Sequence, residues 1–189
     1  MNVVVFCGSA MGTDPAYESV ARELGVWIGS AGHTLVYGGS NTGLMAVVAR
    51  ATMGVGGAVV GVETSTFVAR GVASQRLSRL EVVDTMAQRK HRMMELGDAF
   101  VALPGGVGTL DEVTDVACGA RVGDPAAMGK PCVMLSVDGY WDPLRQMMRR
   151  VVESGFLPDD NPGAAPGSSG ELVRFADSVA RVAEMLGGR

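Results

Sequence analysis

The feature that most constrains the fold is an alternation of short apolar runs with longer segments of helical periodicity. The runs of strand length lie at residues 3–6, 33–37, 58–62, 80–83, 100–103 and 131–135. Short, nearly continuous apolar runs are typical of parallel strands that are buried on both faces. Strands that alternate with helices of about 10–15 residues indicate βαβ units. The sequence therefore predicts an α/β fold with a doubly wound parallel sheet.

Helix signals lie between these runs. Asp14 followed by Pro15 is typical of an N-cap with proline at the first helical position, and it predicts a helix that ends near Ser30. Further helices are expected over residues 44–53, 84–96, 142–153 and 171–186, and one from the glycine turn near 105 to about 120. Residues 158–170, rich in Pro, Gly, Asp and Ser, predict a mobile surface loop. We expect a single domain over residues 1–189, without internal repeats.

Composition excludes several functional classes. A net charge of -4 argues against a nucleic-acid-binding surface, which usually has a basic excess. Cys7, Cys118 and Cys132 form no CxxC pair, so free thiols in a reducing cytoplasm are expected, and no metal site. No apolar run approaches the roughly 20 residues of a membrane span, and no basic leader precedes the first strand. The sequence predicts a cytoplasmic protein that binds neither nucleic acid nor membrane.

Glycines gather where three of the predicted strands end. The turns are Gly8-Ser9, Gly38-Gly39 and Gly105-Gly106-Val107-Gly108. The carboxyl ends of parallel strands meet at one edge of the sheet, where ligands bind. None of the turns matches the dinucleotide fingerprint GxGxxG or the phosphate loop GxxxxGK[ST]. A single glycine-rich turn usually serves only to let the backbone turn tightly. Three such turns at one edge of the sheet predict an anion-binding site of mononucleotide size.

The turn after Pro104 is followed by a helix that carries carboxylates. Thr109 is placed to cap or line the start of this helix, whose free N–H groups and dipole attract a phosphate. Asp111, Glu112 and Asp115 are expected to crowd the first turn, and simple complementarity with the helix dipole would explain them. The functional interpretation places Glu112 and Asp115 on one face, pointing into a pocket. The positive helix end would keep a carboxylate ionised, as a water-activating base or a stabiliser of a cationic sugar intermediate.

A basic segment, Met86-Ala-Gln-Arg89-Lys90-His91-Arg92, opens the preceding helix. His91 and Arg92 are typical of a solvated helix face. Arg89 differs, because it lies near a helix start at the carboxyl edge of the sheet. A guanidinium in that place can bind phosphate or ribose oxygens in bidentate fashion.

Two motifs together, Met86-x-x-Arg89-Lys90 and Pro104-Gly-Gly-x-Gly-Thr109-x-x-Glu112, resemble those of the Lonely Guy family. These are cytokinin-activating phosphoribohydrolases, often catalogued as lysine decarboxylases. The resemblance extends over residues 3–157. It implies a modified Rossmann fold, a homodimer with the site at or near the interface, and no cofactor. The implied reaction is hydrolysis of cytokinin riboside 5′-monophosphates, AMP or both to the free base and ribose 5-phosphate.

The resemblance also implies roles for individual residues. Arg89 and Glu112 would be the catalytic pair, with Glu112 orienting water and offsetting charge on the sugar. The candidate substrate-binding residues are Gly8, Ser9, Gly38, Gly39, Met86, Lys90, Gly105, Gly106, Gly108, Thr109 and Asp115.

The sequence departs from the family pattern in two places. Family members usually carry Gly-Val-Ile-Pro after the third strand, where this chain has Glu63 and Thr64 in place of Ile-Pro. Downstream of Glu112, Asp115 replaces a glutamate, residues 116–121 replace a Thr-Trp-x-Gln-Leu-Gly segment, and residues 122–129 form a longer stretch. In relatives these positions belong to the base-side wall and the dimer surface.

Three other functions were weighed against hydrolysis of these monophosphates. A literal decarboxylase would need pyridoxal phosphate on a lysine, and neither Lys90 nor Lys130 has a recognisable cofactor setting. A non-catalytic carrier of a nucleotide or of the molybdenum cofactor would keep the glycine turns. Such a carrier has no chemical need for the pair of Arg89 and Glu112. A general purine-nucleotide nucleosidase would share the mechanism and differ in substrate alone.

Overall fold

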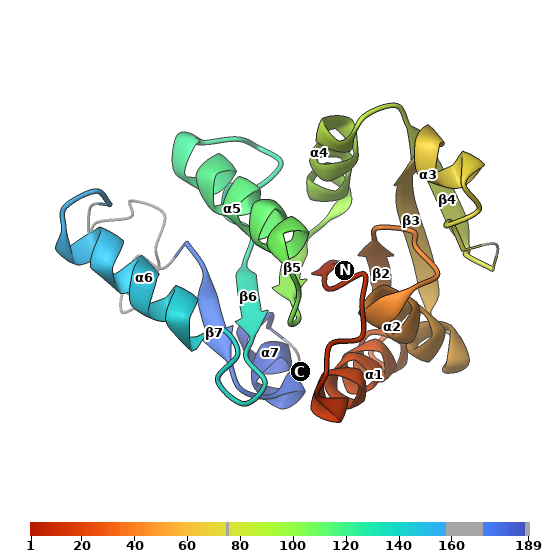
Figure 1. Cartoon of the computed structure of the whole chain (residues 1–189), viewed down its shortest axis with the longest axis horizontal. Helices are drawn as coiled ribbons and strands as arrows, with labels where there is room; N and C mark the ends of the chain where they lie inside the picture. Colours follow the sequence, from red (N-terminus) through yellow and green to blue (C-terminus); the bar gives the residue numbers. More distant parts are fainter. Residues whose placement is uncertain (75, 158–171, 188–189) are drawn as a thin grey trace.

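The computed structural model describes residues 1–74, 76–157 and 172–187. It shows one layered α/β arrangement with a central sheet and helices on both faces (Figure 1). The strands are β1 (Asn2–Phe6), β2 (Thr34–Tyr37), β3 (Ala58–Thr64), β4 (Arg79–Val83), β5 (Ala99–Ala102), β6 (Cys132–Leu135) and β7 (Arg174–Ala176). The helices are α1 (Pro15–Ser30), α2 (Gly43–Gly54), α3 (Ser65–Ala69), α4 (Met86–Leu96), α5 (Val107–Val122), α6 (Asp142–Glu153) and α7 (Val179–Met185).

The sheet is parallel throughout, in the order β4-β3-β2-β1-β5-β6-β7. Side chains of β1 alternate between two hydrophobic cores, as strand geometry requires. Val3 and Val5 pack with α1, α2 and α7, whereas Val4 and Phe6 pack with α4 and α5. The predicted doubly wound sheet is therefore confirmed.

The order of the strands reverses next to β1. The chain proceeds from β1 through β2 and β3 to β4 in one direction, and then from β5 through β6 to β7 in the other. Strands β2 and β5 both pair with β1, so the turns that follow these three strands are neighbours. This is the topological switch point, where ligands bind in open α/β sheets. The three glycine turns lie there.

Most predicted elements are confirmed, including the cap of α1. The Asp14 carboxylate accepts a hydrogen bond of 2.8 Å from the Ala16 N–H. The short helix α3 was not predicted. The predicted mobile loop over 158–170 lies outside the described residues.

The helix predicted over residues 171–186 is wrong in its first half. Residues 174–176 form β7, which pairs with β6, and the helix begins only at Val179. The apolar residues of this short segment are spaced as in a helix. Strand pairing at the sheet edge and the burial of Ala176 outweigh that local preference. Ser178 caps α7 by accepting a hydrogen bond from the Arg181 N–H.

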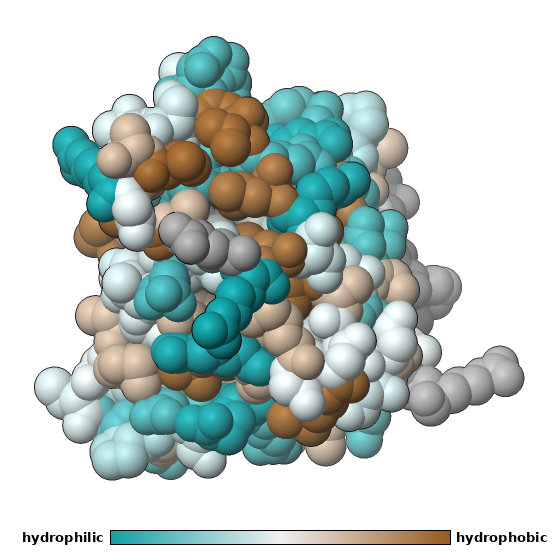
Figure 2. Space-filling model, turned by 90° about the vertical axis from the view of Figure 1, so that its right-hand side faces the viewer, coloured by the Kyte–Doolittle hydropathy of each residue, from teal (hydrophilic) through white to brown (hydrophobic). Residues whose placement is uncertain are grey.

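The surface beside β4 and α3 is mixed in character. Figure 2 shows hydrophilic residues there, interrupted by hydrophobic patches. Val82, on the edge strand β4, is one of the exposed hydrophobic residues of this region. Of the helices within the described ranges, none is both long and apolar enough to cross a membrane.

Candidate active site

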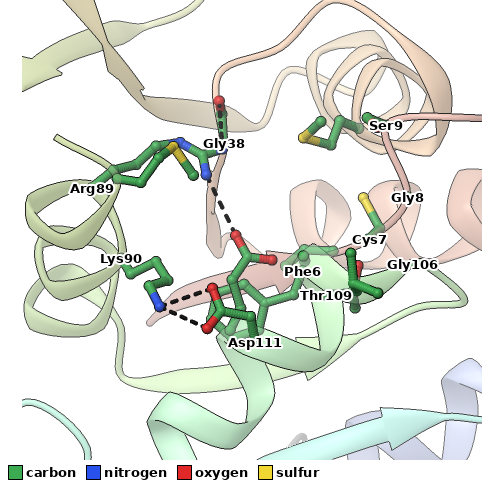
Figure 3. Close-up of a pocket in the computed structure, with 16 residues that line it drawn as sticks. Phe6, Cys7, Gly8, Ser9, Gly38, Arg89, Lys90, Gly106, Thr109 and Asp111 are labelled. Atoms are coloured by element: carbon green, nitrogen blue, oxygen red, sulfur yellow. Dashed lines mark hydrogen bonds and ion pairs between the residues drawn. The ribbon is translucent and has the colours of Figure 1, made fainter.

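A cleft of about 270 Å³ opens at the carboxyl ends of β1, β2 and β5, between the starts of α4 and α5 (Figure 3). It gathers most of the residues predicted from the sequence. Those that line it are Gly8, Ser9, Gly38, Met86, Arg89, Lys90, Gly106, Gly108, Thr109 and Glu112. Gly39, Gly105 and Asp115, also predicted, are not among the lining residues.

The start of α5 presents backbone groups to this cleft. Gly106 is the N-cap residue, and no side chain accepts from the first N–H groups of the helix. A Cβ added to Gly106 or Gly108 would meet nothing within 4 Å, so both residues face open space. Unpaired N–H groups at the positive end of a helix attract anions. This part of the cleft can hold a phosphate.

Gly105 has a different role from its neighbours, because it packs the turn instead of lining the cleft. A Cβ at this position would overlap the Thr109 hydroxyl and lie 2.9 Å from the Gly8 nitrogen. The Gly105 carbonyl accepts a hydrogen bond of 2.7 Å from the Tyr140 hydroxyl. Gly39, with a φ of 74°, similarly shapes the turn after β2 without reaching the cleft.

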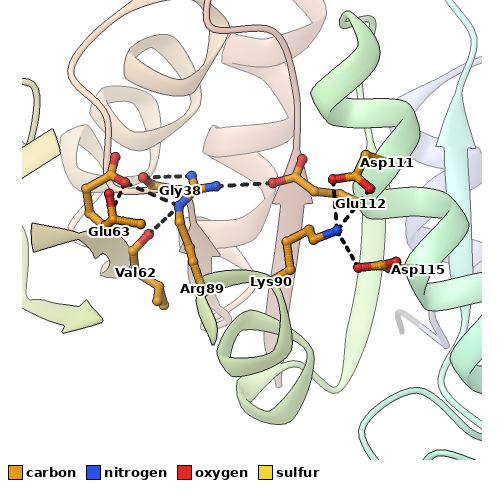
Figure 4. A network of polar contacts seen from close by, with 9 residues as sticks. Gly38, Val62, Glu63, Arg89, Lys90, Asp111, Glu112 and Asp115 are labelled. Carbon is orange, nitrogen blue, oxygen red and sulfur yellow. Dashed lines mark hydrogen bonds and ion pairs between the residues drawn. The ribbon is translucent and has the colours of Figure 1, made fainter. Parts of the chain in front are cut away.

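Arg89 is the most heavily engaged side chain of the site. Its Nε donates to the Val62 carbonyl over 2.9 Å and its Nη2 to the Gly38 carbonyl over 3.0 Å. The same guanidinium forms ion pairs with Glu63 at 3.4 Å and Glu112 at 3.5 Å. Figure 4 shows it lying between these two carboxylates. The bidentate clamp predicted for phosphate or ribose is thus occupied by protein groups, and Nη1 is directed at Glu112.

Glu112 lies largely buried in the cleft, with 13% of its side chain exposed. Burial raises its pKa to about 7, although the positive charge of Arg89 opposes that rise. The helix end therefore does not hold the pKa of this carboxyl group in its usual range, and the group is only partly ionised near neutral pH. The helix begins at Val107, so Glu112 lies beyond the first turn, and desolvation outweighs the weakened dipole.

Lys90 and Asp115 form a separate ionic group at the rim. The Lys90 ammonium donates to both Asp111 oxygens, over 2.9 and 2.8 Å, and lies 2.6 Å from an Asp115 oxygen. The hydrogen bonds that Lys90 donates to these carboxylates raise the pKa of Lys90. Asp115 is half exposed and is not a lining residue, so the prediction that it points into the pocket with Glu112 is wrong. Its attraction to Lys90 turns it toward the α4 side.

Sequence reasoning did not identify Glu63, which contacts Arg89 behind the cleft, as functional, and it did not identify the lining residues Cys7, Met45 and Asp111. Glu63 is 2% exposed, and its Oε1 accepts a hydrogen bond of 2.8 Å from the Thr64 N–H. Burial raises its pKa, against the effects of that hydrogen bond and of Arg89. A signal was present in the sequence, because a carboxylate ends an otherwise apolar strand where the family pattern has isoleucine.

The second departure from the family pattern has a structural setting as well. Val116 and Ala117 lie on the buried face of α5 and pack in the core with residues of β5 and β6. In the described part of the chain, no group of three or more His, Cys, Asp or Glu side chains is placed to hold a metal ion.

The fold and the cleft define a Rossmann-like α/β protein with uncapped backbone N–H groups and a buried carboxylate at its switch point. A solved structure of the same fold is the molybdenum cofactor binding protein from Rippkaea orientalis. It has a TM-score of 0.70 and 20% identity, and the match covers 98% of this chain and 94% of that one.

Residues 45–185 match the family model described as "Possible lysine decarboxylase", and the chain belongs to this family. A rice relative, named a probable cytokinin riboside 5′-monophosphate phosphoribohydrolase, is 42% identical over 156 residues, which are 82% of this chain and 67% of that protein. A cytokinin riboside 5′-monophosphate phosphoribohydrolase of Rhodococcoides fascians is 41% identical over 157 residues, 82% of this chain and 78% of that protein. The family predicted from the two motifs is confirmed.

Proposed function

We propose that this protein hydrolyses the N-glycosidic bond of cytokinin riboside 5′-monophosphates, of AMP or of both, releasing the free base and ribose 5-phosphate. The names of the rice and Rhodococcoides relatives support this reaction class. One observation carries the proposal in the structure. The Glu112 carboxyl group lies in the same cleft as the open N–H groups at the start of α5.

The proposed roles follow from this arrangement. The backbone around Gly106, Gly108 and Thr109 would bind the 5′-phosphate, with the turn at Gly8 and Ser9 next to it, since the Gly8 N–H donates to the Pro104 carbonyl over 3.1 Å. Binding of this remote group supplies the energy that fixes the ribose beside Glu112.

The chemistry requires a group that both accepts a proton and offsets positive charge. Cleavage of the bond passes through a transition state like an oxocarbenium ion, which a carboxylate beside the anomeric carbon stabilises. A base with a pKa of about 7 is well matched to removing a proton from water at neutral pH. One water is consumed: its hydroxyl bonds to the anomeric carbon, the carbon–nitrogen bond breaks, and the remaining proton leaves with the base. Arg89 would hold Glu112 in place.

The name of the family suggests a decarboxylase, but the lysines do not fit one. Lys90 is bonded to two aspartates, and the Lys130 ammonium donates to the Met94 carbonyl over 2.9 Å, away from the cleft. A Schiff-base lysine needs an accessible amine beside the cofactor. We therefore do not assign that activity.

The test is to incubate the purified protein with AMP and, separately, with isopentenyladenosine monophosphate, and to chromatograph the products for free base. Glu112→Gln should reduce release by about a thousandfold, since a general base contributes about 10²–10⁴-fold, while AMP binding by calorimetry is retained. Glu95→Gln, which alters an exposed carboxylate of α4, is the matched control. If the wild type binds AMP but releases no base from either compound, a carrier of nucleotides or of the molybdenum cofactor becomes the better assignment.

Two further proposals concern the setting of the enzyme. We propose a homodimer, supported by exposed hydrophobic residues at and after the end of α5, such as Val122 and Met128. Light scattering of the purified protein tests it. We also propose a cytoplasmic location, supported by the free thiols Cys7, Cys118 and Cys132. Fractionation of the source cells tests that.

A further inference from the structure

Glu63 lies on the opposite side of Arg89 from Glu112 (Figure 4). The two carboxylates approach the guanidinium at nearly the same distance, 3.4 Å from Glu63 to Nε and 3.5 Å from Glu112 to Nη1. The exposed fractions of the three side chains are 3%, 8% and 13% for Glu63, Arg89 and Glu112. This is a buried row of three charged groups with one cation in the middle.

One cation cannot compensate two buried carboxylates. A buried charge is costly unless it is paired, so the guanidinium is shared and one negative charge of the row stays uncompensated. Burial raises the pKa of Glu63, whereas the Thr64 N–H and Arg89, which both face its oxygen, favour its ionised form. Glu63 therefore competes with Glu112 for the charge of Arg89.

We propose that Glu63 is a positioning residue of this enzyme, which anchors Arg89 and takes up part of its charge so that Glu112 keeps the ability to accept a proton from water. This inference rests on the proposed hydrolase function. It deepens that function by adding a residue to the machinery that acts through another side chain and does not touch the substrate.

The other charges around the row do not replace this effect. The titratable and charged groups that face Glu112 or Glu63 are Arg89 and Lys90 from α4, Asp111 and Asp115 from α5, Cys7 after β1, and Tyr37 from β2. Of the two cations, Lys90 is already bonded to Asp111 and Asp115. The charge that Arg89 offers to Glu112 is thus controlled mainly from the Glu63 side.

Substitution can separate the charge of Glu63 from its geometry. Arg89 also bonds to the Val62 and Gly38 carbonyls, which are backbone groups that a substitution at position 63 does not remove. In Glu63→Gln the side-chain oxygen can still accept from the Thr64 N–H, so position is preserved and charge is lost. In Glu63→Asp the charge is preserved and the reach is shortened. A purely structural role would make Asp the more damaging change, whereas the proposal makes Gln the one that alters the pH dependence.

The experiment measures kcat/KM against pH for the wild type, Glu63→Gln and Glu63→Asp, with the monophosphate that the wild type hydrolyses. We expect the acid limb of the pH profile of Glu63→Gln to move about one pH unit lower. The reason is that Arg89 then pairs with Glu112 alone, which lowers the pKa of Glu112. The limb of the Asp variant should stay near that of the wild type. An unmoved limb in Glu63→Gln, or equal shifts in both variants, would overturn the proposal.

A second measurement does not depend on turnover. The carboxyl carbons of ¹³C-labelled glutamate are titrated by NMR, with Glu112→Gln used to assign the Glu112 signal. Its midpoint should fall by about one unit in Glu63→Gln. If the wild type releases no base, the proposed function fails while this titration still decides whether Glu63 controls Glu112. A midpoint that does not move refutes the inference even in an active enzyme.

Discussion

Two sets of residues, here called the glycine wall and the charged wall, form the cleft and the packing behind it, and they consist of different chemical groups. The glycine wall consists of Gly8, Gly105, Gly106, Gly108 and Thr109. The charged wall consists of Glu63, Arg89 and Glu112. The glycine wall presents backbone groups whose positions follow from turns and one helix start. The charged wall presents side chains that are buried together, so each holds its place only while its partners are present.

The difference lies also in the range of the contacts. Within the glycine wall, Thr109 and Gly105 are four residues apart and pack against each other. In the charged wall, Arg89 bonds to carbonyls that are 27 and 51 positions away in the chain. We therefore expect the glycine wall to be sensitive to substitutions that change the shape of its turn, and the charged wall to be sensitive to substitutions that change a charge. Four substitutions test this contrast.

The largest loss of stability is expected in the charged wall, from Arg89→Met. This change leaves two carboxylates and two carbonyls without their buried donor. Breaking a buried ion pair by removing one partner costs about 3–5 kcal/mol. Urea unfolding at pH 8, where protonation of the carboxylates relieves the loss less than it does at lower pH, should show that loss. A loss below about 1 kcal/mol would mean that water already reaches this guanidinium.

In the glycine wall, Gly105→Ala should cost less, about 1–3 kcal/mol, because a methyl group is forced into a packed turn. The added carbon would overlap the Thr109 hydroxyl. Gly54→Ala is the matched control, since a Cβ at the end of α2 meets nothing within 4 Å. Thermal unfolding of both variants gives the comparison. Equal melting temperatures for the two would show that the turn relaxes and that its shape is not critical.

The same contrast explains which parts of the molecule the sequence predicts. Strands β1 to β6 and the glycine wall are encoded locally, in apolar runs and in the glycines that follow them, so these strands were predicted with nearly correct bounds. Arg89 and Glu112 were predicted from motif spacing and do meet in the cleft. Their proposed catalytic roles stay predictions.

The features that local sequence patterns did not predict depend on contacts with residues of distant elements. The pKa of Glu112 follows from burial that only the assembled cleft provides, and the dipole argument gave the opposite direction. Asp115 shares a helix with Glu112, yet a lysine on α4 draws it away from the cleft. Glu63 comes from β3, and its partner Arg89 lies on α4. Strand β7 was missed because its pairing with β6 is not visible in its own short sequence.

Within the charged wall, Glu112→Gln should make the protein more stable at high pH. The pKa of Glu112 is raised from its usual range to about 7 in the folded protein, so between these values the folded state binds more protons than the unfolded state. Stability of the wild type must then fall as pH rises through this window. Relative to the wild type, Glu112→Gln should gain about 1–3 kcal/mol at pH 8 and lose this advantage near pH 4. Denaturant unfolding at both pH values measures it.

The exposed Glu95→Gln variant serves as the control for that gain, since its carboxylate lies on the surface of α4. It should show no increase in stability at pH 8. A Glu112→Gln variant that gains the same amount at pH 4 and pH 8 would refute the pH linkage, because a gain independent of protonation would come from packing.

The smallest effect is expected from Arg92→Met, on the same helix as Arg89 and three residues further along. Arg92 also meets two carboxylates, Glu81 at 2.7 Å and Glu95 at 3.0 Å, but 39% of its side chain is exposed. Water screens such pairs, so the loss in urea unfolding should be about 0.5 kcal/mol, and base release should be unchanged. The loss should shrink further in 1 M salt, where the screening length is about 3 Å. If Arg92→Met lost as much free energy of unfolding as Arg89→Met, the contribution of an arginine of α4 to stability would depend on its two carboxylate partners and not on its burial.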